Sequence, residues 1–238
     1  MKTRSKALLL SLCAVLLVAA SVLGTMAYLT DSETVTNTFT VGQVHLTLDE
    51  AKVNPMGQPL DENGKAPGEE GYNSDKLAPR WKPTTEDSEQ EYHLLPGHSY
   101  TKDPTVTVVA GSEESYVRMM VAVSFKEALT SEQLATNLDS IFAGYKVDKW
   151  IREDKIIGDD QKTITYEYRY YTAVDASNAT EGVKLEPLFT AINVPGEYTN
   201  EQIAFLGGMN ITVEAHAIQA SGFETVDAAW DAFDNQTP

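Results

Sequence analysis

The sequence predicts an all-β protein, a sandwich of sheets with two or three short helices at its periphery. Short stretches in which apolar and polar residues alternate recur along most of the chain. Turn residues such as the pair Pro96-Gly97 separate these stretches, and only a few short segments have helical spacing. Many short strands with few helices are typical of a β-sandwich.

The first 27 residues have the pattern of an export signal. Three basic residues within the first six positions precede an uncharged apolar run from 7 to 24, and small residues surround Ala27. We expect a signal helix that a signal peptidase removes between Ala27 and Tyr28. Because an apolar run of about 18 residues is close to the lower limit for crossing a bilayer, an uncleaved leader that anchors the chain in a membrane is the alternative.

The composition limits the partners and the disulfide bonds that the exported chain can have. The 238 residues carry a formal charge of −17, and the leader contains three basic and no acidic residues, so the chain from Tyr28 has a charge of about −20. A surface this acidic repels phosphate backbones, which argues against nucleic acid as a partner. The single cysteine, Cys13, lies in the leader, so the exported chain has no disulfide and depends on its own core.

The first predicted strand lies directly behind the leader, at residues 38–48. Phe39 and Val41 share one face, whereas the apolar residues from Val44 onward have the opposite parity. Gly42 lies where the phase changes, and a β-bulge there would restore a common apolar face.

Residues 51–92 interrupt the alternating pattern. This segment contains five prolines, four glycines and nine acidic residues, and it has little periodicity. We therefore expect a polar, acidic excursion at 51–92 within a single domain that spans 28–238.

The remaining elements follow in short succession. The clearest strand runs from Val117 to Phe125, because every second residue in it is apolar. Pro187 interrupts one further stretch and places it at a sheet edge or a bulge. Strands are expected at 104–109, 146–157, 161–172, 184–193 and 209–217, and helices or helical turns at 130–142, 200–206 and 226–233.

Six stretches of the sequence together resemble a known family. They are residues 27–33 and 37–42 at the leader junction, Pro96-Gly97, 102–104, 115–118 and 211–219. These stretches resemble the TasA/camelysin family of secreted biofilm-matrix and surface proteins of Gram-positive bacteria. The resemblance implies a jelly-roll-like sandwich, cleavage by a signal peptidase of the endoplasmic-reticulum type, and secretion. It also implies assembly into extracellular fibres, in which the N-terminal segment of one subunit completes a sheet of the next.

Camelysin is associated with metalloprotease activity, but the sequence lacks the corresponding motif. The four histidines, His45, His93, His98 and His216, form no His-Glu-x-x-His pair. There is no Gly-x-Ser-x-Gly motif and no cysteine after the leader. We therefore expect no enzyme, no catalytic residue, no cofactor and no metal site, and we expect His45 and His216 to face solvent.

Two further patterns each have a structural and a binding interpretation. Tyr166, Tyr168 and Tyr170 alternate along one predicted strand, as either a sugar-binding platform or a wall of the core. Ile164 on the same face favours the core. Asp61 begins a four-residue fragment of a calcium loop, but the remaining ligands are missing, so a solvated turn is favoured.

The segment that begins at Tyr28 is the main functional hypothesis, and we call residues 28–41 the arm. Fully extended, its first 11 residues span up to about 36 Å, which is enough to follow the edge strand of a neighbouring subunit. Leu29 and Val35 would be the apolar anchors, and Phe39 and Val41 would lead into the subunit's own sheet. The alternative is that the arm is disordered or pairs with its own subunit.

We therefore expect a secreted structural or accessory subunit of an extracellular fibre, in a biofilm matrix or at a cell surface. Its partners would be copies of itself or related matrix subunits, and it would meet a membrane only through an uncleaved leader. Two alternatives remain at the level of sequence, a monomeric surface-associated binding module and a camelysin-like metalloprotease.

Overall fold

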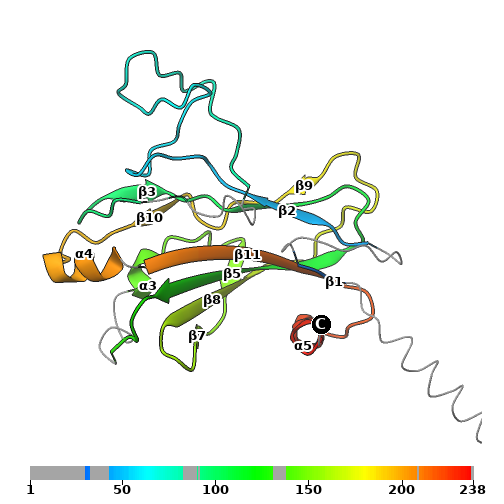
Figure 1. Ribbon diagram of the computed structural model, residues 1–238. Helices are drawn as coiled ribbons and strands as arrows, with labels where there is room; N and C mark the ends of the chain where they lie inside the picture. Colours follow the sequence, from blue (N-terminus) through cyan, green and yellow to red (C-terminus); the bar gives the residue numbers. More distant parts are fainter. Residues whose placement is uncertain are drawn as a thin grey trace, which may run out of the picture.

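Antiparallel sheets dominate the structure (Figure 1). The computed structural model describes residues 30–32, 43–82, 90, 92–130, 138–207 and 209–236. The predicted all-β class is confirmed at this level, and the described residues also form three short helices. The leader and most of the arm lie outside the described residues.

The largest described sheet has six strands in the order β1-β11-β5-β8-β6, and β7 pairs with β8 as well. All of its pairs are antiparallel. Strands β5 and β11 form its long centre, because they pair over all 11 residues of each. The bounds are β1 (Thr30–Ser32), β5 (Ser115–Phe125), β6 (Trp150–Arg152), β7 (Ile156–Ile157), β8 (Thr163–Tyr170) and β11 (Met209–Gln219).

Two smaller sheets form a second layer, drawn above the large sheet in Figure 1. One has the order β2-β4-β9 and the other pairs β10 with β3. Side chains from both layers, such as Val106 and Val121, belong to one buried apolar cluster, so the two layers enclose a common core. The bounds are β2 (Leu46–Asp49), β3 (Ser99–Thr101), β4 (Thr105–Val108), β9 (Val183–Lys184) and β10 (Ala191–Asn193).

The alternation of the sequence explains which side chains fill this core. In β5 the buried apolar residues are the predicted ones, every second residue from Val117 to Phe125. In β8, Tyr166 and Tyr168 are fully buried beside Ile164, which confirms the core interpretation of the tyrosine row. Tyr170 is half-buried and packs edge-on against Trp150, with ring centroids 5.0 Å apart.

Two predicted strands are divided in the structure. The stretch 146–157 forms β6 and β7, which follow one another along the edge of β8. The stretch 184–193 forms β9 and β10, which belong to different sheets. Pro187 has no N–H to continue a ladder, and beyond it the chain leaves β4 and pairs with β3 instead.

The three described helices are α3 (Leu138–Ile141), α4 (Asn200–Leu206) and α5 (Val226–Asp234). Thr199 and Gln202 form a capping box at the start of α4, and the Thr225 side chain caps α5. Helix α5 lies against the outer face of the large sheet, the face that points away from the second layer (Figure 1). Among the described helices, none is long and apolar enough to cross a membrane.

Candidate functional site

The described part of the arm is a strand at one edge of the large sheet. Strand β1 runs antiparallel to β11, with Thr30 opposite Ile218 and Ser32 opposite His216. It covers three of the 11 residues of β11, and no other described strand pairs with that side of Met209–Ala215. We call this side of β11 the arm edge.

The residues to which the sequence assigned functions lie mostly outside the described part of the chain. This holds for the cleavage pair Ala27 and Tyr28, for the expected anchors Leu29 and Val35, and for Phe39 and Val41, which were expected to lead into the subunit's own sheet. Their roles stay predictions. What the structure adds is the direction and the register in which the segment between them meets β11.

Helix α5 covers the same part of β11 that pairs with β1. Trp230 and Ile218 belong to one small buried apolar cluster. Phe233 stacks on His216, with ring centroids 4.9 Å apart and an angle of 22° between the planes. The arm edge is therefore supported from the outer face by the C-terminal helix.

Arg118 of β5 joins the sheet to α5. Its buried guanidinium lies 4.4 Å from the centre of the Trp230 ring and 4.9 Å from that of Phe233. It donates to both carboxylate oxygens of Asp234, from Nη1 at 3.0 Å. Glu167 of β8 lies 3.5 Å from the same guanidinium. We call these five residues the C-terminal anchor.

The C-terminal anchor also affects the pKa of Asp234 and the exposure of His216. The hydrogen bond from Arg118 lowers the pKa of Asp234, although partial burial opposes this effect. The expectation that His216 faces solvent is wrong, because α5 covers the outer face of β11, which a strand pattern alone assigns to solvent. His45, which directly precedes β2, is exposed as expected.

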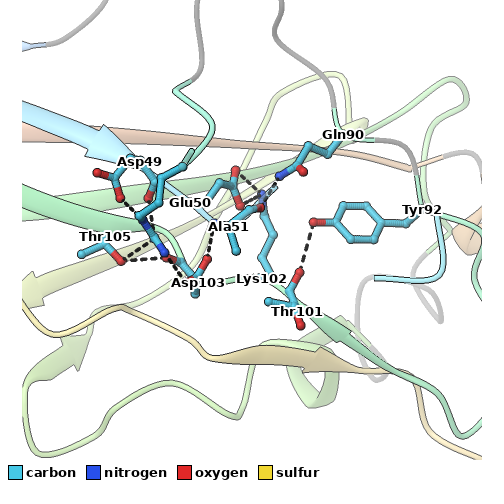
Figure 2. Close-up of polar contacts among 10 residues, drawn as sticks. Asp49, Glu50, Ala51, Gln90, Tyr92, Thr101, Lys102, Asp103 and Thr105 are labelled. Carbon is cyan, nitrogen blue, oxygen red and sulfur yellow. Dashed lines mark hydrogen bonds and ion pairs between the residues drawn. The ribbon is translucent and has the colours of Figure 1, made fainter. Parts of the chain in front are cut away.

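A second polar cluster lies where the excursion leaves the sandwich (Figure 2). The ammonium of Lys102 donates to both carboxylate oxygens of Glu50, at 2.8 and 2.7 Å, and both side chains are less than 10% exposed. Arg80 bonds Asp49 and Asp103, the latter at 2.7 Å. We call these five residues the loop base.

Neutral groups complete the loop base. Asp103 accepts a hydrogen bond from the main-chain N–H of Ala51, and the amide of Gln90 donates to the Ala51 carbonyl at 3.1 Å (Figure 2). The Tyr92 hydroxyl donates to the carbonyl of Thr101 at 3.3 Å. These contacts hold the beginning and the end of the 51–92 excursion against β2 and β3.

Asp61 organises the described part of the excursion from inside. It is fully buried, and its carboxylate accepts main-chain hydrogen bonds from Asn63 and Lys65 at 2.9 Å and from Asn73 at 3.1 Å. The bond from Lys65 is the main cause of the lowered pKa of Asp61, against a smaller opposing effect of burial. The interpretation as a solvated turn is therefore wrong. Amide donors engage both carboxylate oxygens, which identifies Asp61 as a structural turn residue.

Neither a metal-ligand cluster in the described residues nor a known relative adds chemistry to this picture. Within the described ranges, no three His, Cys, Asp or Glu side chains are grouped in a way that could hold a metal ion. No protein-family model, no curated protein and no solved structure matches the chain. The arm edge is thus the feature of the described chain that bears most directly on the function expected from sequence.

Proposed function

We propose that this protein is a secreted structural or accessory subunit of an extracellular fibre, with a jelly-roll-like fold, and that it assembles by donating its arm to a neighbouring subunit. One observation carries the proposal, the pairing of Thr30–Ser32 with the edge of β11. A contact that a terminal segment makes within one chain can also form between two identical chains by exchange of that segment.

The register of β1 makes the proposal more specific. A donated arm that keeps this register would bring Val35 opposite Val213 and Phe39 opposite Met209. Val213 and Met209 are partly buried and pack against the core, so the expected anchor Val35 would meet an apolar neighbour, and so would Phe39 at the point where the arm turns toward its own sheet. The segment Leu29–Phe39 would also match β11 residue for residue over its length of 11. Main-chain hydrogen bonds along such a strand supply affinity.

A monomeric surface-associated binding module is the second candidate, and the same strand favours it in a different way. In the structure β1 pairs with β11 of its own chain, which would close the arm edge without any partner. The two candidates therefore differ in one physical respect, whether Thr30–Ser32 pairs within a chain or between chains.

An engineered disulfide distinguishes the two candidates. The chain from Tyr28 has no cysteine of its own, so Asp31→Cys and Ala217→Cys, which lie opposite each other, introduce a defined pair. The two single variants are mixed, incubated at increasing concentration and oxidised. The products are separated by non-reducing electrophoresis. Asn178→Cys, at an exposed position outside the arm edge, replaces Ala217→Cys in the control mixture.

Arm donation requires a disulfide-linked dimer of Asp31→Cys with Ala217→Cys that forms far more readily than the control product. The double variant should then give covalent ladders at high concentration. Two results together would favour the binding module instead. The double variant would give only a covalently closed monomer, and the mixture of single variants would give no more disulfide-linked dimer than the control mixture.

A further inference from the structure

The large sheet has a second edge, opposite the arm edge, and it is built differently. Strands β6 and β7 follow one another along β8, and on their other side no strand pairs with them among the residues that the structure describes. The main-chain N–H of Glu153 donates to the carbonyl of Glu167 at 3.0 Å and keeps the intervening residues against β8. Residues 150–157 thus form one edge that no described strand covers, and the register on β8 shifts by one residue between β6 and β7.

Isoleucine side chains stand out along this edge. Ile151, Ile156 and Ile157 are 51%, 55% and 41% exposed. Ile151 lies opposite Arg169 and Ile156 opposite Thr165, so both belong to the outer face of the sheet. We call residues 150–157 the isoleucine edge.

The basic residues of this edge do not prevent it from pairing with another chain. Natural sheet edges are commonly guarded by a charged side chain, often a lysine, that prevents pairing with another chain. Here Lys155 lies 3.0 Å and Arg152 4.0 Å from the carboxylate of Asp139 on α3, which holds both cations against their own subunit. Burial alone would raise the pKa of Asp139, but bonds from Lys155 and Tyr166 outweigh it and lower the pKa.

Charge also favours contact between copies at this place. The whole chain has a formal charge of −17, which makes close approach of two copies unfavourable over most of the surface. The segment 146–169, in contrast, contains six basic and six acidic residues. Two copies that meet through it bring together neutral segments rather than acidic ones.

We propose that the isoleucine edge binds a second copy of this chain through the same edge of that copy, so that two large sheets join into one. In the described chain β1 already occupies part of the arm edge, whereas the isoleucine edge is uncovered. A two-fold arrangement of identical edges is closed, and closed two-fold dimers are the commonest homo-oligomers. Antiparallel edges of this kind place the isoleucines of one copy beside those of the other. The contact involves about eight residues on each side, so a weak, reversible dimer is expected.

Sedimentation equilibrium of the chain from Tyr28 tests the proposal, with substitutions at exposed positions. Ile156→Lys should weaken dimerisation about ten-fold or more, because it replaces a buried apolar contact by a charge. Val147→Lys is the matched control, since Val147 is 70% exposed, lies outside β6 and adds the same charge. Asp154→Asn should strengthen dimerisation several-fold, because a two-fold contact brings Asp154 of both copies together. Glu153 is already 3.7 Å from Arg169.

Equal effects of Ile156→Lys and Val147→Lys, or a wild-type chain that is monomeric at every concentration, would overturn the proposal. The proposal does not rest on arm donation, and the closed Asp31→Cys/Ala217→Cys monomer separates the two. With its arm locked within the chain, this monomer should still dimerise through the isoleucine edge. If it fails to dimerise while the reduced protein associates, the association belongs to the arm and the isoleucine edge has no part in it.

Discussion

The loop base and the C-terminal anchor both attach a segment of the chain to the sandwich, but they do so through different contacts. Each uses a buried cation to hold a segment against the sandwich, Lys102 for the excursion and Arg118 for α5. The partner of Lys102 is the equally buried Glu50. The main partner of Arg118 is the largely exposed Asp234, and the aromatic rings of α5 supply the rest of the contact.

This difference sets how firmly each segment is held. The excursion is joined to the sandwich at both ends, and its central ion pair is shielded from water and salt. On helix α5, in contrast, the carboxylate of Asp234 is in contact with solvent. We therefore expect the loop base to resist conditions that release α5. Because α5 packs against Ile218 and His216 of β11, its release should also affect the arm edge.

The largest effect is expected from removing one partner of the buried pair. Lys102→Met leaves the carboxylate of Glu50 buried without its cation, which should lower the free energy of unfolding by about 3–5 kcal/mol. Urea unfolding followed by circular dichroism measures this change. The double variant Lys102→Met/Glu50→Leu is the control and should recover much of the loss, because two apolar side chains replace the pair. A single variant as stable as the wild type would show that Glu50 reaches water.

A smaller effect is expected at the C-terminal anchor. Arg118→Leu removes the contact with both rings, but Glu167 keeps its 2.7 Å bond to Arg169, so no carboxylate is left buried and unpaired. We expect a loss of about 2–3 kcal/mol, with faster hydrogen exchange concentrated in α5. Arg118→Lys is the matched control. Its free energy of unfolding should lie between those of the wild type and Arg118→Leu, because a lysine keeps the charge and loses the planar guanidinium. Uniform loss of protection over the whole sheet would contradict a local role for Arg118.

The same two clusters show what could be predicted from the sequence. Strand β5 and helices α4 and α5 were expected close to their observed bounds, because strand alternation, turn residues and helical spacing are local properties. The ion pairs were not expected, because the residues that form them are far apart in sequence. Glu50 and Lys102 are separated by 52 residues, and Arg118 and Asp234 by 116.

Long-range pairing likewise limited the prediction of the sheets. The division of 184–193 into β9 and β10 depends on which strands lie beside each half, and Pro187 alone indicated only an interruption. The alternation of β5 puts Arg118 on the strand face opposite the core, but the cover supplied by α5 could not be inferred from β5 itself. At the candidate site, the pairing of Thr30–Ser32 with β11 agrees with an arm near a sheet edge. The anchors on either side of it stay predictions.

The smallest effect is expected from lowering the pH, which tests the contact between Asp234 and Arg118 in the C-terminal anchor. The pKa of Asp234 in the folded protein is lowered by Arg118, so its contribution to stability is present above the usual aspartate value, near pH 4, and is lost as the pH falls through the lowered pKa. Because Asp234 is 57% exposed, solvent screening limits this contribution to less than about 1 kcal/mol. Amide NMR signals of α5 should therefore shift below pH 4. Asp234→Asn should remove this step, whereas Asp231→Asn, an exposed change on the same helix, should keep it. A step of equal size in both variants would mean that a group other than Asp234 releases α5 at low pH.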